Sequence, residues 1–263
     1  MMRKNPISVF AKPLVTSKNM GISSKPTYVG HRSRIKEKYE KSGLHGWHDY
    51  EVLELALSYS IARKDTKCIA KELLGKFKTL NAILDADIKD LQSISGISKH
   101  SALFLKLLKD VAVLYMEKGL HGRDLLSSPQ VVCDYLKVAL KGLSDEEFCM
   151  LFLDGRNQLI EIETLKTGTV NRAVVFPRKI VERALYHHAV SVIVAHNHPS
   201  GALEPSAEDK DITRAIKNAL KTVDIALLDH VIIGGNGTDA AIGGGGTDTC
   251  YSEYKNRAQR ELA

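Results

Sequence analysis

The spacing of apolar residues divides the chain into two parts of different character. In residues 30–122 apolar positions recur every three or four residues, as in "DYEVLELALSYSI" and "DTKCIAKELLGKF", and this spacing is typical of amphipathic helices. From about residue 127 helical stretches alternate with short β-branched or aromatic runs. We therefore predict an all-helical domain at residues 29–122 and an α/β domain at residues 127–263, separated by the turn-rich "GLHGRDLLSSP".

The second domain begins with a predicted helix, "SPQVVCDYLKVAL", in which Ser128 would cap the helix and Pro129 would take its first position. "EEFCMLFLD" and "QLIEIETLKTG" follow as two predicted strands of an antiparallel hairpin around a "GRN" turn. The remaining predicted elements are the helix "PRKIVERALYHHA", the buried strand "SVIVAHNH", the helix "SAEDKDITRAIKNALKTV" and the strand "IALLDHVIIGG".

Two helices in the first domain are joined by a short turn, Gly96-Ile97-Ser98. This arrangement resembles a helix-hairpin-helix, which presents backbone N–H groups and a helix N-terminus to a DNA phosphate. Such turns usually carry two glycines, and Ser98 stands in place of the second. The sequence leaves two interpretations open, a DNA contact and a hairpin that serves packing alone.

Charge is unevenly distributed along the 263 residues. Residues 1–125 hold 22 Lys and Arg against 13 Asp and Glu, whereas residues 126–263 hold 15 against 18. A basic first part is suited to nucleic acid, although a solvated basic surface without a partner explains the charge equally well. Residues 1–28 are basic, lack acidic residues and have little periodicity, so we expect them to be disordered.

The remaining composition points to a cytoplasmic protein. No apolar run reaches the length of a membrane span, and the start lacks the apolar segment of a secretory signal. The four cysteines, Cys68, Cys133, Cys149 and Cys250, are scattered without a CxxC pair. We expect reduced thiols that bind no zinc.

The candidate chemistry lies in "HNHPSGALEPSAED", where a buried strand ends. Residues i and i+2 of a strand face the same side, so His196 and His198 would point together. Ser206 would open the next helix, with Asp209 one turn inside it and able to reach the two imidazoles. Two histidines and a carboxylate form a three-ligand set typical of catalytic zinc, which leaves a fourth position for water.

Ser206 and Asp209 also have a purely structural interpretation. Ser-x-x-Asp at the start of a helix is close to a capping box, in which the acidic residue serves the helix end. A histidine pair followed at this range by Ser-x-x-Asp is much rarer than either feature alone, which favours the metal site. The two roles are compatible.

These residues carry a resemblance to a known family. "HNHPSGALEPSAED" is similar to the JAMM pattern of the MPN-type zinc peptidases. The chain as a whole, over roughly residues 30–235, resembles the bacterial RadC family in "GHRSRIKEKY", "DYEVLELALSYSIARKDTK", "GTVNRAVVFPRKI", "AHNHPSG" and "LLDHVIIGG". The resemblance implies a helix-hairpin-helix domain followed by a JAMM-type, cytidine-deaminase-like α/β/α domain with a mixed sheet.

The resemblance also implies two further site residues beside one zinc ion per chain. A glutamate at the start of the domain's first strand would act as general base, and counting back from "FLDG" places it at Glu146. Glu147 would face the opposite side of the strand. Ser206 would donate its hydroxyl to the developing oxyanion.

The implied function is zinc-dependent hydrolysis of an amide, peptide or isopeptide bond in a protein or peptide substrate. The alternative is a DNA-binding protein of repair or recombination, in which the JAMM domain serves interaction. Hydrolysis of phosphodiesters is a third possibility, but the second part of the chain lacks the excess of Lys and Arg that a nuclease gathers around its site.

The chain departs from the family pattern in three places. Lys179 stands where Pro-Arg-Glu is usual, and Ser98 replaces the hairpin glycine. After Gly235 the usual aromatic final strand is not evident. The glycine-rich "GGNGTDAAIGGGG" found there lacks the Gly-Lys-Ser/Thr of a phosphate loop, and we predict a flexible loop.

Overall fold

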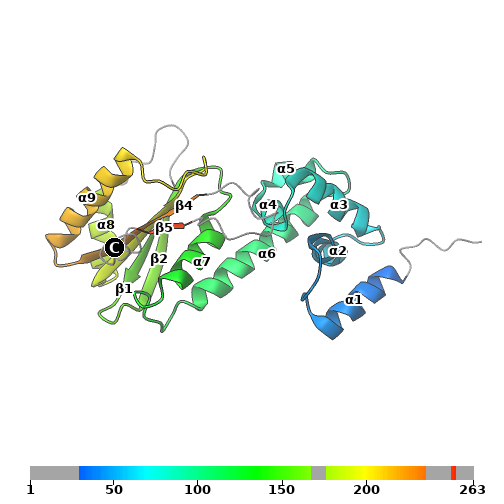
Figure 1. The fold of residues 1–263 in the computed structure, drawn as a ribbon, viewed down its shortest axis with the longest axis horizontal. Helices are drawn as coiled ribbons and strands as arrows, with labels where there is room; N and C mark the ends of the chain where they lie inside the picture. Colours follow the sequence, from blue (N-terminus) through cyan, green and yellow to red (C-terminus); the bar gives the residue numbers. More distant parts are fainter. Residues whose placement is uncertain (1–29, 167–175, 235–249, 253–263) are drawn as a thin grey trace, which may run out of the picture.

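The computed structural model describes residues 30–166, 176–234 and 250–252 (Figure 1). The predicted disordered segment 1–28 and most of the glycine-rich stretch lie outside these residues. Six helices precede the α/β part: α1 (His31–Ser42), α2 (Asp49–Ser60), α3 (Thr66–Phe77), α4 (Leu80–Asp85), α5 (Ile88–Gln92) and α6 (Lys99–Lys118). The α/β part contains α7 (Pro129–Leu140), β1 (Glu147–Leu153), β2 (Leu159–Lys166), α8 (Pro177–Tyr186), β3 (Ser191–Asn197), α9 (Ala207–Lys221), β4 (Ala226–Ile233) and β5 (Cys250–Ser252).

The helical part has a hydrophobic core of its own, to which α2 to α6 contribute. Leu53, Leu73, Ile83 and Leu105 are at most 1% exposed and belong to one cluster. Asp65 caps α3 as predicted, since its carboxylate accepts a hydrogen bond from the backbone N–H of Lys67. The 3.6-residue periodicity of this region therefore indicated its helices correctly.

The turn between α5 and α6 forms where the sequence predicted it. Gly96 has a positive φ of 92°, and a Cβ at this position would lie 2.8 Å from the Cδ1 atom of Ile69. Ser98 caps α6, because its hydroxyl oxygen accepts a hydrogen bond from the N–H of Ser101. The hairpin is thus fixed by packing and capping, and Ser98 already occupies one of the N–H groups that a phosphate would use.

The second part is a three-layer α/β/α arrangement around a mixed sheet. The strand order is β2-β1-β3-β4-β5, with β3 and β4 parallel and the other pairs antiparallel. One hydrophobic cluster joins α7 to one face of the sheet, and a second joins α8 and α9 to the other face. β3 is the central strand of the sheet and is buried along its whole length.

Long helix α6 connects the two parts (Figure 1). Its first half belongs to the helical core, whereas Val113 and Met116 pack against the cluster that covers the sheet beside α7. Lys109, only 8% exposed, forms an ion pair with Asp85 at 2.6 Å and donates a hydrogen bond to the carbonyl oxygen of Lys141. The end of α4 is thereby held beside the segment that leads into β1.

Several details differ from the expectations. Ser128 stands at the N-cap position of α7, but its side chain forms no capping hydrogen bond, and Pro129 occupies the first helical position as predicted. Strand β5 was not predicted, and it adds an edge to the sheet beside β4. The expectation of reduced thiols is wrong for Cys133, which is disulfide-bonded, whereas Cys68 and Cys149 are free. None of the described helices combines the length and apolarity needed to span a membrane.

Candidate metal centre

The carboxyl end of β3 supplies the first two residues of the site. His196 lies within the strand and is 1% exposed. His198 follows the last strand residue, but its N–H still donates a hydrogen bond to the carbonyl oxygen of Ile233 on β4, at 2.8 Å. The pairing therefore continues to His198 and keeps both imidazoles on the same side, as the i, i+2 spacing predicted.

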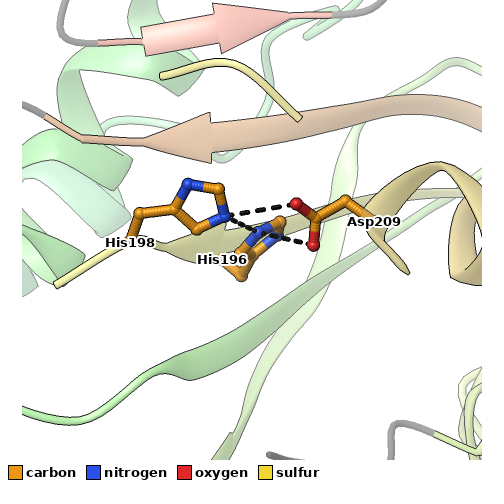
Figure 2. A group of neighbouring side chains, drawn as sticks. All are labelled: His196, His198 and Asp209. Atoms are coloured by element: carbon orange, nitrogen blue, oxygen red, sulfur yellow. Dashed lines mark hydrogen bonds and ion pairs between the residues drawn. The ribbon is translucent and has the colours of Figure 1, made fainter. Parts of the chain in front are cut away.

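The third residue comes from the first turn of α9. The Asp209 carboxylate lies 3.3 Å from the Nε2 atom of His196 and 3.3 Å from that of His198. The two Nε2 atoms are 2.8 Å apart, and one ligand atom from each of the three residues falls within 4.8 Å of the others. Figure 2 shows the two rings and the carboxylate directed at one point. The structure thus brings together the three residues that the sequence predicted as ligands.

A hydrogen bond to the backbone determines which nitrogen of His198 carries a hydrogen and which has the lone pair. Its Nδ1 atom lies 2.8 Å from the carbonyl oxygen of Ala202, which can only accept, so Nδ1 carries the hydrogen. When the ring carries a single hydrogen, Nε2 is then the nitrogen with the lone pair. Gly234 allows this turn to approach, because a Cβ there would lie 2.7 Å from the same carbonyl oxygen.

Burial sets the charge of the other groups. It lowers the pKa of His196 to about 4 and that of His230, its neighbour on β4, to about 3, so both rings are neutral at pH 7. Burial by itself raises the pKa of Asp209, but the hydrogen bonds from Ser206 and the two nearby imidazoles outweigh it and leave this pKa below its ordinary value. Neutral imidazoles and an ionised carboxylate are the forms that bind metal.

These groups fit a divalent cation by their chemistry. The Nε2 atoms of the two imidazoles and the carboxylate lie within about 3 Å of one another, and their lone pairs repel unless a cation or a proton lies between them. Imidazole nitrogen and carboxylate oxygen are both ordinary zinc ligands. His196, His198 and Asp209 would hold the ion.

Ser206 and Asp209 also form the capping box of α9. The Ser206 hydroxyl oxygen accepts a hydrogen bond from the Asp209 N–H at 3.1 Å, and the Asp209 carboxylate accepts one from the Ser206 N–H at 2.7 Å. The structural interpretation of this pair is therefore correct, and the same bonds direct the carboxylate toward the histidines. The O–H of Ser206 is not needed for the cap, and the residue is exposed at the rim of the site.

Glu146 lies immediately before β1, beside the end of β3. The antiparallel register pairs Phe148 with His196 at the end of the ladder, and continuing it by two residues would place Glu146 opposite His198. Directly opposed residues share a face of the sheet, so on this continuation Glu146 would belong to the face that carries the two histidines. Glu147 belongs to the other face, as the sequence predicted.

Asn197 holds this segment in place. Its side-chain oxygen accepts a hydrogen bond from the Glu147 N–H at 2.8 Å, and its NH₂ group donates one to the carbonyl oxygen of Asp145 at 3.0 Å. Asn197 is only 3% exposed, and its two hydrogen bonds hold the backbone in place on both sides of Glu146. Residue spacing alone assigned no role to Asn197, because strand alternation only turns its side chain away from the histidines.

A cleft of about 500 Å³ opens beside the metal-binding residues. Asn197, His198 and Pro199 line one side of it. The opposite side comes from the helical part of the chain and includes Asp85 and Asp87. Of the three candidate ligands His198 lines this cleft, whereas His196 and Asp209 do not, and the cleft is large enough for a few residues of an extended chain.

Two comparisons with known proteins agree with this architecture. Residues 126–241 match the RadC-like JAB domain family. Over 211 residues the chain is 39% identical to UPF0758 protein FN0909 of Fusobacterium nucleatum, and the match covers 78% of this chain and 91% of that protein. The chain belongs to the RadC (UPF0758) family.

The RadC family match extends beyond the JAB domain, because the 39% identical relative covers 78% of this chain. The structure also shows what surrounds two residues, Lys179 and Ser98, at which this RadC chain departs from the pattern described above. Lys179, where an acid is usual, lies in the first turn of α8 and pairs with Glu182 at 3.5 Å, with both side chains about half exposed. Its substitution therefore leaves the three ligands and their partners intact. The second departure, Ser98, is accommodated as the cap of α6.

Proposed function

We propose that the chain is a zinc-dependent hydrolase that cleaves an amide bond in a peptide or isopeptide substrate. The observation that carries this proposal is the convergence of His196, His198 and Asp209 on one point, with His198 at the edge of an open cleft. Three protein ligands leave a coordination position for a non-protein group, which is typical of catalytic rather than structural zinc. The JAMM resemblance and the JAB-domain match support the same class of reaction.

The protein residues around the ion have distinct roles in this proposal. Bound zinc would lower the pKa of a water molecule from about 16 toward about 7. Glu146 would accept the proton of the attacking water and pass it to the leaving amine. The exposed hydroxyl of Ser206 would donate a hydrogen bond to the oxygen of the substrate carbonyl as negative charge develops on it, and losing one such donor typically costs about 3–4 kcal/mol of transition-state stabilisation.

The cleft indicates how a substrate would be presented. It is open, and the helical part contributes one wall, so an extended peptide segment would lie between the two parts with its scissile amide beside His198. We propose a protein or peptide as the natural substrate, with catalysis in the cytoplasm as the sequence composition suggests.

This function is tested with a library of peptides and isopeptides whose cleavage releases a fluorophore. We expect hydrolysis by the full chain that stops when zinc is removed with a chelator and returns when zinc is restored. Copper or magnesium added alone serves as the control for nonspecific metal effects. Cleavage that continues at the same rate after complete removal of metal would contradict the proposal.

DNA binding by the helical part is the second candidate. It is supported by the excess of basic residues in this part and by the short hairpin between α5 and α6. Exposed Lys99 stands at the start of α6, next to the capped turn. Binding would rest on phosphate contacts and would have no sequence preference.

Fluorescence anisotropy of the full chain with labelled duplex DNA tests this candidate. We expect binding at low salt that weakens by about 10³-fold or more between 50 and 200 mM salt if six or more phosphates are contacted. Replacing Lys99 by glutamine should weaken binding equally for unrelated sequences. Absence of binding at the lowest salt would leave the hairpin a packing element.

A further inference from the structure

A chain of hydrogen bonds behind the metal-binding residues connects two of them through residues that are not ligands. The Nδ1 atom of His196 lies 2.8 Å from the Nε2 atom of His230 on β4. The Nδ1 atom of His230 contacts the hydroxyl oxygen of Thr213, and this hydroxyl donates to the backbone carbonyl oxygen of Asp209. The path therefore runs from β3 through β4 to α9 and ends at the residue that provides the carboxylate.

The direction of every bond in this path follows from its last member. A carbonyl oxygen only accepts, so the single hydroxyl hydrogen of Thr213 is committed to Asp209. The hydroxyl oxygen must then accept from His230, whose Nδ1 therefore carries the hydrogen. A ring that is only 4% exposed favours its neutral form with a single hydrogen, so its Nε2 has a lone pair, and the Nδ1 of His196 must donate to it. The Nε2 of His196 is left bare and faces Asp209 and His198.

The two imidazoles of this path are shielded from water, which makes the hydrogen bond between them hard to replace, whereas Thr213 is half-buried. His196 and His230 are 1% and 4% exposed. The ring of Phe148 stacks beside His196 at 6.4 Å and meets the ring of His230 edge-on at 6.0 Å. In such surroundings a polar group that loses its partner finds no water to replace it.

We infer that Thr213 and His230 are positioning residues which fix the protonation pattern of His196, so that its metal-facing nitrogen is already bare before any ion arrives. This inference rests on the metal site proposed above and adds two residues that do not touch the ion. The hydroxyl of Thr213 determines which atom donates and which accepts in each of these hydrogen bonds. Without it, His230 is free to carry its hydrogen on Nε2, and His196 is then driven to carry its own on the nitrogen that faces the ligands.

The decisive variant is Thr213→Val, which keeps the shape of the side chain and removes the hydroxyl. Thr213→Ser restores the hydroxyl. Thr222→Val is a matched control, since the Thr222 hydroxyl also donates to a backbone carbonyl near the end of the same helix but lies in an exposed position away from the histidines. Circular dichroism and thermal melting establish that each variant is folded.

Two measurements on each protein test the inference. Imidazole ¹⁵N spectra of the metal-free protein should show His196 protonated at Nδ1 in wild type, Thr213→Ser and Thr222→Val, and protonated mainly at Nε2 in Thr213→Val. Competition with a chromophoric zinc chelator should show a Kd for zinc that rises roughly 10–100-fold in Thr213→Val, the range typical of partners behind metal ligands. The other two variants should remain close to wild type.

The spectrum of the metal-free wild type tests the inference even if no variant folds. Protonation of His196 at Nε2 in that spectrum would overturn it. So would a Thr213→Val protein that binds zinc as tightly as wild type, or one that binds it weakly with the protonation of His196 unchanged. A wild type that shows the expected protonation but binds no zinc would instead refute the proposed function and leave the arrangement of Thr213 and His230 intact.

Discussion

Glu146→Gln is expected to retain zinc and to lose about 10²–10⁴-fold of the hydrolytic rate, which is the usual contribution of a general base. The amide is close to the carboxylate in size but cannot accept a proton. Zinc binding should persist because Glu146 is not one of the three ligands, and the Asn197 contacts that position this segment involve only the backbone of its neighbours. Rates with a cleavable peptide and zinc content are measured on the same preparation.

Glu147→Gln is the matched control, one residue further along. It places the same substitution on the opposite face of the strand and should leave both rate and zinc content nearly unchanged. If Glu147→Gln loses activity and Glu146→Gln does not, Glu147 is the general base, and the strand register at the start of β1 differs by one residue from the one described above. If both variants are as active as wild type, no carboxylate at the start of β1 takes part in the reaction.

Much of the fold follows from local patterns that the sequence shows directly. The helical periodicity before residue 122, the hairpin of β1 and β2 and the buried strand β3 were all predicted from the spacing of apolar residues. β5 was not predicted, because it has only three residues and follows a glycine-rich stretch, so its sequence has no periodicity to detect. The disulfide at Cys133 was not predicted, because the spacing of scattered cysteines does not reveal which of them meet in space.

The residues of the candidate site also differ in whether local sequence spacing predicts their contacts. His196 and His198 are two residues apart and Ser206 and Asp209 three apart, so strand and helix geometry predicts which of them face together. Asn197 acts on a segment about 50 residues earlier in the chain, and His196 meets His230 34 residues later. These contacts depend on the order of β1, β3 and β4 in the sheet, which local spacing does not determine.

The second large effect is the loss of zinc on removal of a ligand. His196→Ala deletes one of the three groups, and the affinity should fall by more than the roughly 10–100-fold typical of outer partners. Because His196 is buried against Phe148, this change also leaves a cavity. Asp209→Asn is therefore made in parallel, since the amide oxygen can still accept the Ser206 N–H and preserve the helix cap.

Zinc content per chain shows directly whether His196, His198 and Asp209 bind a metal ion. The purified proteins are dialysed against the same zinc-buffered solution and analysed for metal, with His100→Ala on the exposed surface of α6 as the control. We expect about one zinc per chain in wild type and His100→Ala, and strong depletion in folded His196→Ala and Asp209→Asn. Equal zinc in all four proteins, or none in wild type, would contradict this expectation.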